Sequence, residues 1–175
     1  LDELRGRPLR TRIPSSALVA VVVVGLAGAL ALGVAGVYRV GWTLIPFMVA
    51  GPILVIAYNA ELFGGAMHTD FGFAVAWGAF PVLTGYVAQA GSLAVAPVLA
   101  AAGAFALSAA QRRLSTPARN IRRRAVRVEG SITFGDGRIV PITADGLLRP
   151  LELALRAASW AIVLLAAALA VARLT

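Results

Sequence analysis

Long uncharged blocks of apolar residues dominate the pattern along this chain. Residues 13–111 contain only three formally charged side chains, which are Arg39, Glu61 and Asp70. A soluble helix or strand keeps a polar face toward water, so such a stretch excludes an ordinary soluble core. A membrane-spanning helix needs roughly 20 apolar residues in succession and satisfies its own backbone hydrogen bonds. The pattern therefore predicts spans at residues 17–38, 40–58, 71–90, 93–110 and 157–172, the last extended by 151–156 at the interface.

The fold class that follows is an all-α polytopic transmembrane helix bundle of about five spans, forming one membrane domain over residues 1–175. Residues 111–149 form the one segment of soluble character, and Pro117 predicts a break there. Within it, Gly135-Asp-Gly137 separates two short β-prone runs and predicts a hairpin, with Asp136 serving the turn. Because Leu1 is not methionine and Thr175 directly follows a span, we expect both ends to be truncated.

Two features of the spans concern helix packing. Gly25, Ala29 and Gly33 recur at four-residue spacing, a pattern of small residues that lets another membrane helix approach closely. Abundant Gly and Ala in the chain explain the same spacing equally well. Pro46, Pro52 and Pro81 lie inside the second and third spans, where membrane helices tolerate proline. We expect kinks there that line an internal cavity.

Arginines set the expected orientation. The chain has a net charge of +8, and all of its basic residues are arginines, as is typical of GC-rich bacteria. Four arginines precede the first span and nine lie in residues 111–149, so the positive-inside rule places both segments in the cytoplasm. Four spans separate them, which makes 59–70 cytoplasmic and the 38–41 and 90–92 turns external. We therefore expect a multi-pass protein of the bacterial plasma membrane.

The arginines also bear on partners. An arginine cluster beside a span attracts anionic headgroups of membrane lipids, and topology with lipid anchoring accounts for residues 112–127. The segment lacks interleaved aromatic side chains, so no nucleic-acid partner is expected. The chain has no cysteine, which excludes disulfides and thiolate metal sites.

One short polar segment, residues 58–70, carries the candidate chemistry. It holds Glu61, Asp70 and the only histidine of the chain, His68. Carboxylates and an imidazole at the mouth of a bundle can hold a cation or orient a polar substrate, but a solvated loop contains the same residues. A lone histidine without cysteine does not indicate zinc. The residues alone leave both interpretations open.

The sequence of the third span resembles a known family. The run is Asp70-Phe-Gly-Phe-Ala-Val-Ala-Trp77-Gly78-Ala-Phe-Pro81-Val-Leu-Thr-Gly85-Tyr86-Val-Ala-Gln89-Ala-Gly91. It is similar to the UbiA family of membrane prenyltransferases, in which an acidic residue begins a span and a Gly-x-x-Pro-Val-x-Gly-x-Tyr-type stretch follows. The branch that makes naphthoquinone lipids is most similar. Tyr58-Asn59 and Arg7-Pro8-Leu9 occupy positions where the family has comparable motifs.

The resemblance implies transfer of a polyprenyl group from a polyprenyl diphosphate to an aromatic, quinone-precursor acceptor. The diphosphate lies at the cytoplasmic mouth, where Mg²⁺ neutralises it, and the isoprenoid tail lies among the helices. Magnesium favours carboxylates together with substrate phosphates, and arginine suits bidentate diphosphate contacts. The implied roles are catalytic for Tyr58, Asn59 and Asp70, substrate-binding for Arg5, Arg7, Glu61 and His68, and metal-binding for Asp2.

One departure from the family keeps an alternative open. A second aspartate-rich motif should follow the fourth span, yet residues 109–124 contain no acid and are strongly cationic. The alternative is a non-catalytic isoprenoid-binding or assembly protein on the same scaffold. A transporter is a weaker hypothesis, because it would place charged residues at mid-span and the first four spans contain none.

The predicted orientation can be tested by cysteine labelling, because the natural chain contains no competing thiol. Single cysteines at positions 65 and 120 should both react only when an impermeant maleimide reaches the cytoplasmic face. A cysteine at position 92, on an external turn, should react from the opposite side. Labelling of position 65 from the periplasm, with position 120 shielded, would contradict the orientation.

Overall fold

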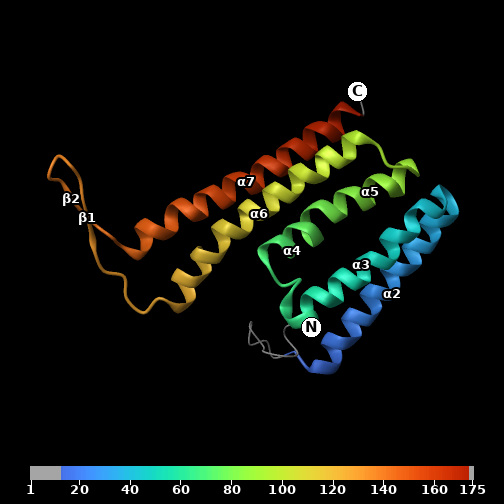
Figure 1. The fold of residues 1–175 in the computed structure, drawn as a ribbon, viewed down its shortest axis with the longest axis horizontal. Coiled ribbons are helices and arrows are strands. Elements are labelled where there is room, and N and C mark those ends of the chain that lie inside the picture. Colours follow the sequence, from blue (N-terminus) through green and yellow to red (C-terminus); the bar gives the residue numbers. More distant parts are fainter. Residues whose placement is uncertain (1–12, 174–175) are drawn as a thin grey trace. The chain divides into compact units, whose positions relative to one another are not determined.

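The computed structural model describes residues 13–173, and nearly all of the secondary structure in this range is helical (Figure 1). The chain forms two compact units, Leu1–Ala109 and Ala110–Thr175, and one long helix contributes to both. The elements are α2 (Ser15–Val40), η1 (Trp42–Leu44), α3 (Ile45–Asn59), η2 (Phe63–Gly65), α4 (Asp70–Ala74), η3 (Val75–Ala79), α5 (Phe80–Ala90), α6 (Val95–Arg124), β1 (Ser131–Thr133), β2 (Ile139–Pro141) and α7 (Ala144–Ala172).

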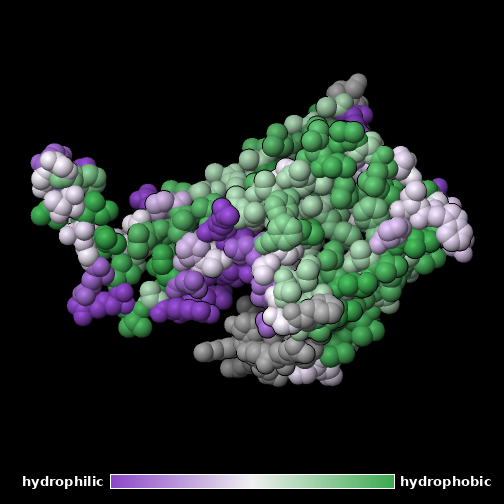
Figure 2. Space-filling model, in the orientation of Figure 1, coloured by the Kyte–Doolittle hydropathy of each residue, from purple (hydrophilic) through white to green (hydrophobic). Residues whose placement is uncertain are grey.

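Five helical segments of the described range are long and apolar enough to cross a membrane, which confirms the predicted helix bundle. They are Ser15–Val40, Trp42–Asn59, Asp70–Ala90, Val95–Arg124 and Ala144–Ala172. Most of their large apolar side chains are exposed, and Figure 2 shows a predominantly hydrophobic surface. Such a surface suits a lipid environment and, with the five spans, indicates a multi-pass membrane protein.

Glycines let α2 pack closely on the second span. A Cβ atom at Gly33 would lie 2.8 Å from Cγ of Met48, and one at Gly36 would lie 2.6 Å from Cδ2 of Leu44. A larger residue at either position would require the side chain of Met48 or Leu44 to move. Gly25, at the N-terminal end of the predicted stripe, has no atom within 4 Å of an added Cβ. The predicted stripe of small residues therefore makes its close contact at its C-terminal end.

The third span is a helix with a wide turn at its centre. Between α4 and α5, the π-helix η3 is closed by a hydrogen bond from the amide of Phe80 to the carbonyl of Val75. Pro81 follows immediately and has no N–H to donate to the carbonyl of Trp77, so the regular α-helical pattern is interrupted at this point. Pro81 therefore coincides with a local change of helix type, from α to π.

Gly78, inside this wide turn, lies directly against α6. A Cβ atom at Gly78 would come within 2.6 Å of Oγ of Ser108 and 2.7 Å of the carbonyl oxygen of Ala104. Because Ala104 contributes backbone, it cannot move aside as a flexible side chain would. Phe71 adds an aromatic contact to Phe105, with ring centroids 5.3 Å apart. The third span and the first half of α6 are therefore joined along one line of contact.

In the second unit, the predicted loop at 111–149 is largely helical, so that prediction was wrong. Helix α6 continues through Pro117 to Arg124, and α7 begins at Ala144, so the connection is limited to residues 125–143. The predicted break at Pro117 was wrong, because Gln, Ala and Arg favour helix and a proline removes only one hydrogen bond from it. Thr143 caps α7, since its Oγ1 accepts a 3.0 Å hydrogen bond from the amide of Gly146.

The predicted hairpin is present and short. Strands β1 and β2 pair antiparallel, with Ile132 opposite Val140. Asp136 serves the turn as expected, because its Oδ1 accepts a 3.0 Å hydrogen bond from the amide of Arg138, while Gly137 takes a φ of 82°. All six strand residues are exposed. The hairpin is therefore held by its own strand pairing and turn, and its strand side chains are exposed.

The contact at Gly78 generates a stability prediction. Gly78→Ala places a methyl group against Ser108 and the backbone of Ala104, and overpacking of this kind costs about 1–3 kcal/mol. We expect the variant to melt at a lower temperature than the natural protein in detergent. Gly85→Ala is the matched control on the same span, because nothing lies within 4 Å of its added Cβ atom. Equal melting temperatures for the two variants would refute the contact.

Candidate functional site

Tyr58 forms the centre of an aromatic cluster at the end of α3. Its side chain is buried, with a relative exposure of 6%. The ring of His68 lies 4.7 Å away at a tilt of 30°, Phe73 lies at 6.1 Å, and Trp77 lies edge-on at 6.2 Å. Rings at these separations attract one another beyond the burial of their area. Tyr58 therefore lies inside the packing of the helices and not at the surface of the protein.

The connector between α3 and α4 places His68 over Tyr58. Gly64 and Gly65 take φ values of 67° and 80°, which residues other than glycine rarely adopt. The resulting turn is held by a 2.8 Å hydrogen bond from the amide of His68 to the carbonyl of Gly65. Nδ1 of His68 lies 3.2 Å from the carbonyl oxygen of Tyr58. The backbone of the connector thus determines which ring faces the tyrosine.

The start of α4 packs tightly under the same connector. A Cβ atom at Gly72 would lie 2.0 Å from the carbonyl oxygen of Met67, so only glycine permits this approach. Thr69 caps the helix, because its Oγ1 accepts a 3.0 Å hydrogen bond from the amide of Gly72. The caps and glycines therefore fix the position of Asp70, which lies in the first turn of α4 with an exposed side chain.

The other predicted residues have more peripheral positions. Asn59 donates a 2.7 Å hydrogen bond from Nδ2 to the carbonyl of Val55, within its own helix. Glu61 is exposed and takes a positive φ of 49°. Asp2, Arg5 and Arg7 lie outside the described residues. The structure therefore brings Tyr58 and His68 into contact, while Glu61 and Asp70 lie exposed on the same connector.

Metal-binding groups are sparse in the described part of the chain. Residues 13–173 contain no group of three or more His, Asp or Glu side chains that could hold a metal ion. A metal site made by protein ligands alone is therefore not formed by these residues. Magnesium, however, commonly takes one or two carboxylates and completes its shell with water and substrate phosphates. The exposed carboxylates of Asp70 and Glu61 fit that limited role by their donor chemistry.

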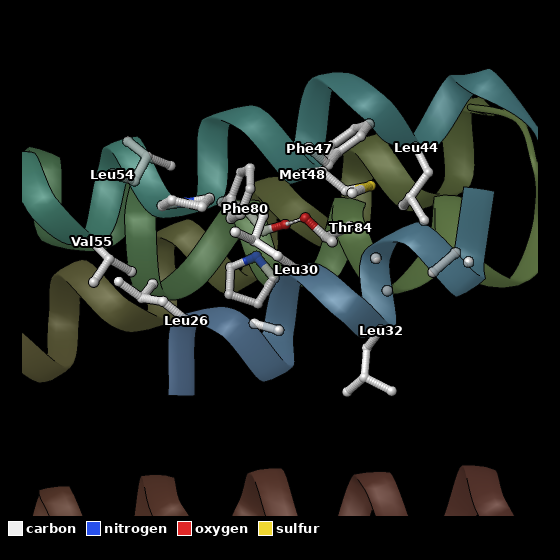
Figure 3. Close-up of a pocket in the computed structure, with 18 of the residues that line it drawn as sticks. Leu26, Leu30, Leu32, Leu44, Phe47, Met48, Leu54, Val55, Phe80 and Thr84 are labelled. Carbon is white, nitrogen blue, oxygen red and sulfur yellow. Dashed lines mark hydrogen bonds between the residues drawn. The ribbon is translucent and has the colours of Figure 1, made fainter. Parts of the chain in front are cut away.

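An apolar cavity of about 590 Å³ lies between α2, α3 and the third span (Figure 3). Its lining includes Leu26 and Leu30 of α2, Phe47 of α3, and Phe80 and Thr84 of α5. No lining residue carries a charge, and the hydroxyl of Thr84 already donates a 2.8 Å hydrogen bond to the carbonyl of Phe80. The cavity therefore suits an apolar chain and offers nothing to hold a charged group.

The sequence only partly indicated this cavity. Pro52 and Pro81 line it, in agreement with the expectation that prolines of the second and third spans border an internal space. Trp77 also lines it. The apolar lining residues gave no separate signal, because apolar side chains occur at almost every position of these spans.

Two residues connect the apolar cavity to the polar connector. Trp77 lines the cavity and places its ring edge-on against Tyr58. Val55 also lines the cavity, and its carbonyl accepts the hydrogen bond from Asn59. The predicted pair Tyr58-Asn59 therefore lies directly beside one end of the cavity. An elongated apolar ligand in the cavity would therefore have one end near Trp77 and Val55, which contact Tyr58 and Asn59.

No protein-family model matches this chain, and neither a curated protein nor a solved structure does. The likeness to the UbiA family consequently rests on the motifs in residues 70–91, at Tyr58-Asn59 and at Arg7-Pro8-Leu9. The geometry described above is independent of that likeness. It combines a cavity for an apolar chain with a polar connector at one end of it.

Proposed function

We propose that this chain is part of a bacterial plasma-membrane protein that binds a polyprenyl diphosphate and transfers the prenyl group to an aromatic, quinone-precursor acceptor. The observation that carries the proposal is the apolar cavity that ends beside Tyr58 and its connector. The resemblance to UbiA prenyltransferases adds the reaction type. In this proposal residues 59–70 face the cytoplasm, where both substrates are available.

The dimensions of the cavity favour a long isoprenoid tail. Its lining on α2 runs from Leu26 to Gly36, which at 1.5 Å per residue corresponds to about 15 Å along the helix. That distance is about half of the hydrocarbon thickness of a bilayer. Each buried methylene group of a ligand contributes about 0.8 kcal/mol, so a tail of several isoprene units gains substantial binding energy from apolar contact alone.

The connector residues would serve the polar end of the substrate. Asp70 and Glu61 supply carboxylate oxygens, and bound Mg²⁺ would neutralise the charge of the diphosphate. Tyr58 presents an aromatic ring next to the cavity end, and such rings stabilise nearby cationic carbon centres through their π face. His68 holds the Tyr58 ring from one side and thereby orients it. Arg5, Arg7 and Asp2 would add diphosphate and metal contacts from outside the described residues.

A second candidate function, isoprenoid binding without catalysis, has an observation of its own in its favour. The C-terminal part of α6 carries Arg122, Arg123 and Arg124 in its last turn, and residues 109–124 have no carboxylate. The UbiA resemblance would place a second magnesium-binding segment here. A protein that only binds or delivers an isoprenoid lipid needs the cavity but does not need this segment.

Turnover distinguishes the two functions. The full-length protein, with a labelled polyprenyl diphosphate, an aromatic acceptor and Mg²⁺, should release pyrophosphate. Asp70→Asn removes a carboxylate at the connector and should lower the rate about 10–100-fold, as is common for residues that support a metal. Asp136→Asn makes the same change in the turn of the hairpin, where the carboxylate serves the turn itself, and should leave the rate unchanged. Absence of turnover with every acceptor tried would favour binding alone.

Occupation of the cavity can be measured separately from catalysis. Ala29→Phe adds a ring to a residue that lines the cavity, and it should reduce crosslinking to a photoreactive polyprenyl analogue about tenfold or more. Ala31→Phe is the matched control, because Ala31 belongs to the same helix but not to the lining. Equal crosslinking of both variants would show that the isoprenoid binds elsewhere.

A further inference from the structure

A second, charged groove lies between α6 and α7, entirely within the unit formed by residues 110–175. It has a volume of about 300 Å³. Its polar lining consists of Ser115, Arg119 and Arg122 on α6 and Glu152 and Arg156 on α7, and Leu155 adds an apolar side chain. We call these six residues the arginine groove. Three guanidinium groups and one carboxylate give it a net charge of +2, which favours an anion.

Helical spacing explains why these side chains share one space. Ser115, Arg119 and Arg122 recur at intervals of four and three residues, so they lie on one face of α6. Glu152 and Arg156 are four residues apart on α7 and face the same groove. The arrangement is therefore a feature of two regular helices and does not depend on a loop.

The ion pairs within the groove leave cationic capacity unused. Arg122 forms an ion pair with Glu152, whose side chain is only 25% exposed. Arg119 reaches only a neutral group, the hydroxyl of Thr116, at 3.5 Å. Within residues 13–173 no hydrogen bond or ion pair engages the guanidinium of Arg156. Two of the three arginines thus have no carboxylate partner in the described part of the chain.

The groove lies where both helices change from apolar to charged. The apolar part of α6 ends near Ala110, and the apolar part of α7 begins at Ala157, directly after Arg156. Figure 2 shows hydrophilic residues gathered over the C-terminal part of α6 and the start of α7, next to a hydrophobic surface. Headgroups occupy the few ångströms outside the hydrocarbon core, so this change marks their level.

We infer that the arginine groove binds the phosphate of an anionic phospholipid. Arginine pairs bidentately with phosphate oxygens, and Arg119 and Arg156 provide two such forks from opposite sides of the groove. Trp160 and Val163 follow Arg156 at intervals of four and seven residues, and both are exposed at 65% and 55%. The same face of α7 thus offers an apolar track for an acyl chain directly beyond the phosphate site. This inference does not depend on the proposed function.

The apolar track distinguishes a lipid from a free anion. A free phosphate would use the guanidinium groups but gain nothing from Leu155, Trp160 and Val163. A phospholipid gains from both, because each buried methylene adds to the binding that the charges provide. The groove therefore favours the headgroup of a phospholipid over a free phosphate, and competition by soluble phosphates tests this preference.

The test uses the full chain in mild detergent and a fluorescent-acyl phosphatidylglycerol as the probe, with fluorescent phosphatidylcholine as the uncharged comparison. Each arginine near a headgroup changes affinity about fivefold, so Arg119→Gln with Arg156→Gln should weaken phosphatidylglycerol binding about 25-fold. The control is Arg127→Gln with Arg138→Gln, which removes the same charge from residues outside the groove. It should change the affinity less than twofold.

The remaining outcomes each decide the inference. Preference for phosphatidylglycerol over phosphatidylcholine, lost only in the groove variant, supports it. Equal weakening by both double variants would overturn it in favour of diffuse surface charge. Displacement of the lipid by inorganic phosphate or pyrophosphate at similar molar concentration would overturn it in favour of a soluble anion. A folded groove variant is verified by its unchanged melting temperature without added lipid.

Discussion

The requirement that lipid imposes on the backbone governs this molecule. Inside a bilayer no water is present to pair with an exposed N–H or carbonyl group, so each segment that crosses must satisfy these groups within itself. The chain meets this requirement with five helical segments of spanning length in the described range. Irregular backbone is confined to short places: the connector at 60–69, the wide turn at Val75–Ala79, and the residues between helices. Glu61 and His68 both lie in the connector at residues 60–69.

This distribution gives the candidate site two parts with different physical tasks. The helices create an apolar cavity, which selects a ligand by contact area and excludes charge. The connector supplies polar groups at one end and uses Gly64, Gly65 and Gly72 to bring His68 and α4 close to Tyr58. Trp77 belongs to both parts. Binding of an apolar tail and handling of a polar head can therefore be changed by different mutations.

The sequence predicted the elements better than their contacts. Span positions followed from block length, because the membrane thickness fixes how many apolar residues a helix needs. The hairpin followed from Gly135-Asp-Gly137, whose turn chemistry is local. The predicted fourth span ended at residue 110, where the uncharged block ends before Arg112, whereas the helix α6 continues to Arg124 because a helix can extend beyond the membrane. The contacts of Tyr58 and Trp77 could not be predicted, because an aromatic residue in a span has the same sequence pattern whether it faces lipid or another ring. The cavity depends on the packing of α2, α3 and α5, which apolar periodicity does not encode.

The wide turn at Val75–Ala79 has a geometric consequence for the third span. A π-turn accommodates one residue more than a regular turn, and one residue corresponds to about 100° of rotation about the helix axis. The half of the span before the turn directs Phe73 toward Tyr58, whereas the half after it directs Phe80 toward Phe47, with ring centroids 6.0 Å apart. A single helix thereby serves two partners that an uninterrupted spiral would not align with the same residues. Deletion or insertion of one amino acid within Val75–Ala79 would rotate one half of the span by about 100° relative to the other half. The contact of Phe73 with Tyr58 and the contact of Phe80 with Phe47 would then no longer form together, and the polar end of the site would be separated from the apolar cavity.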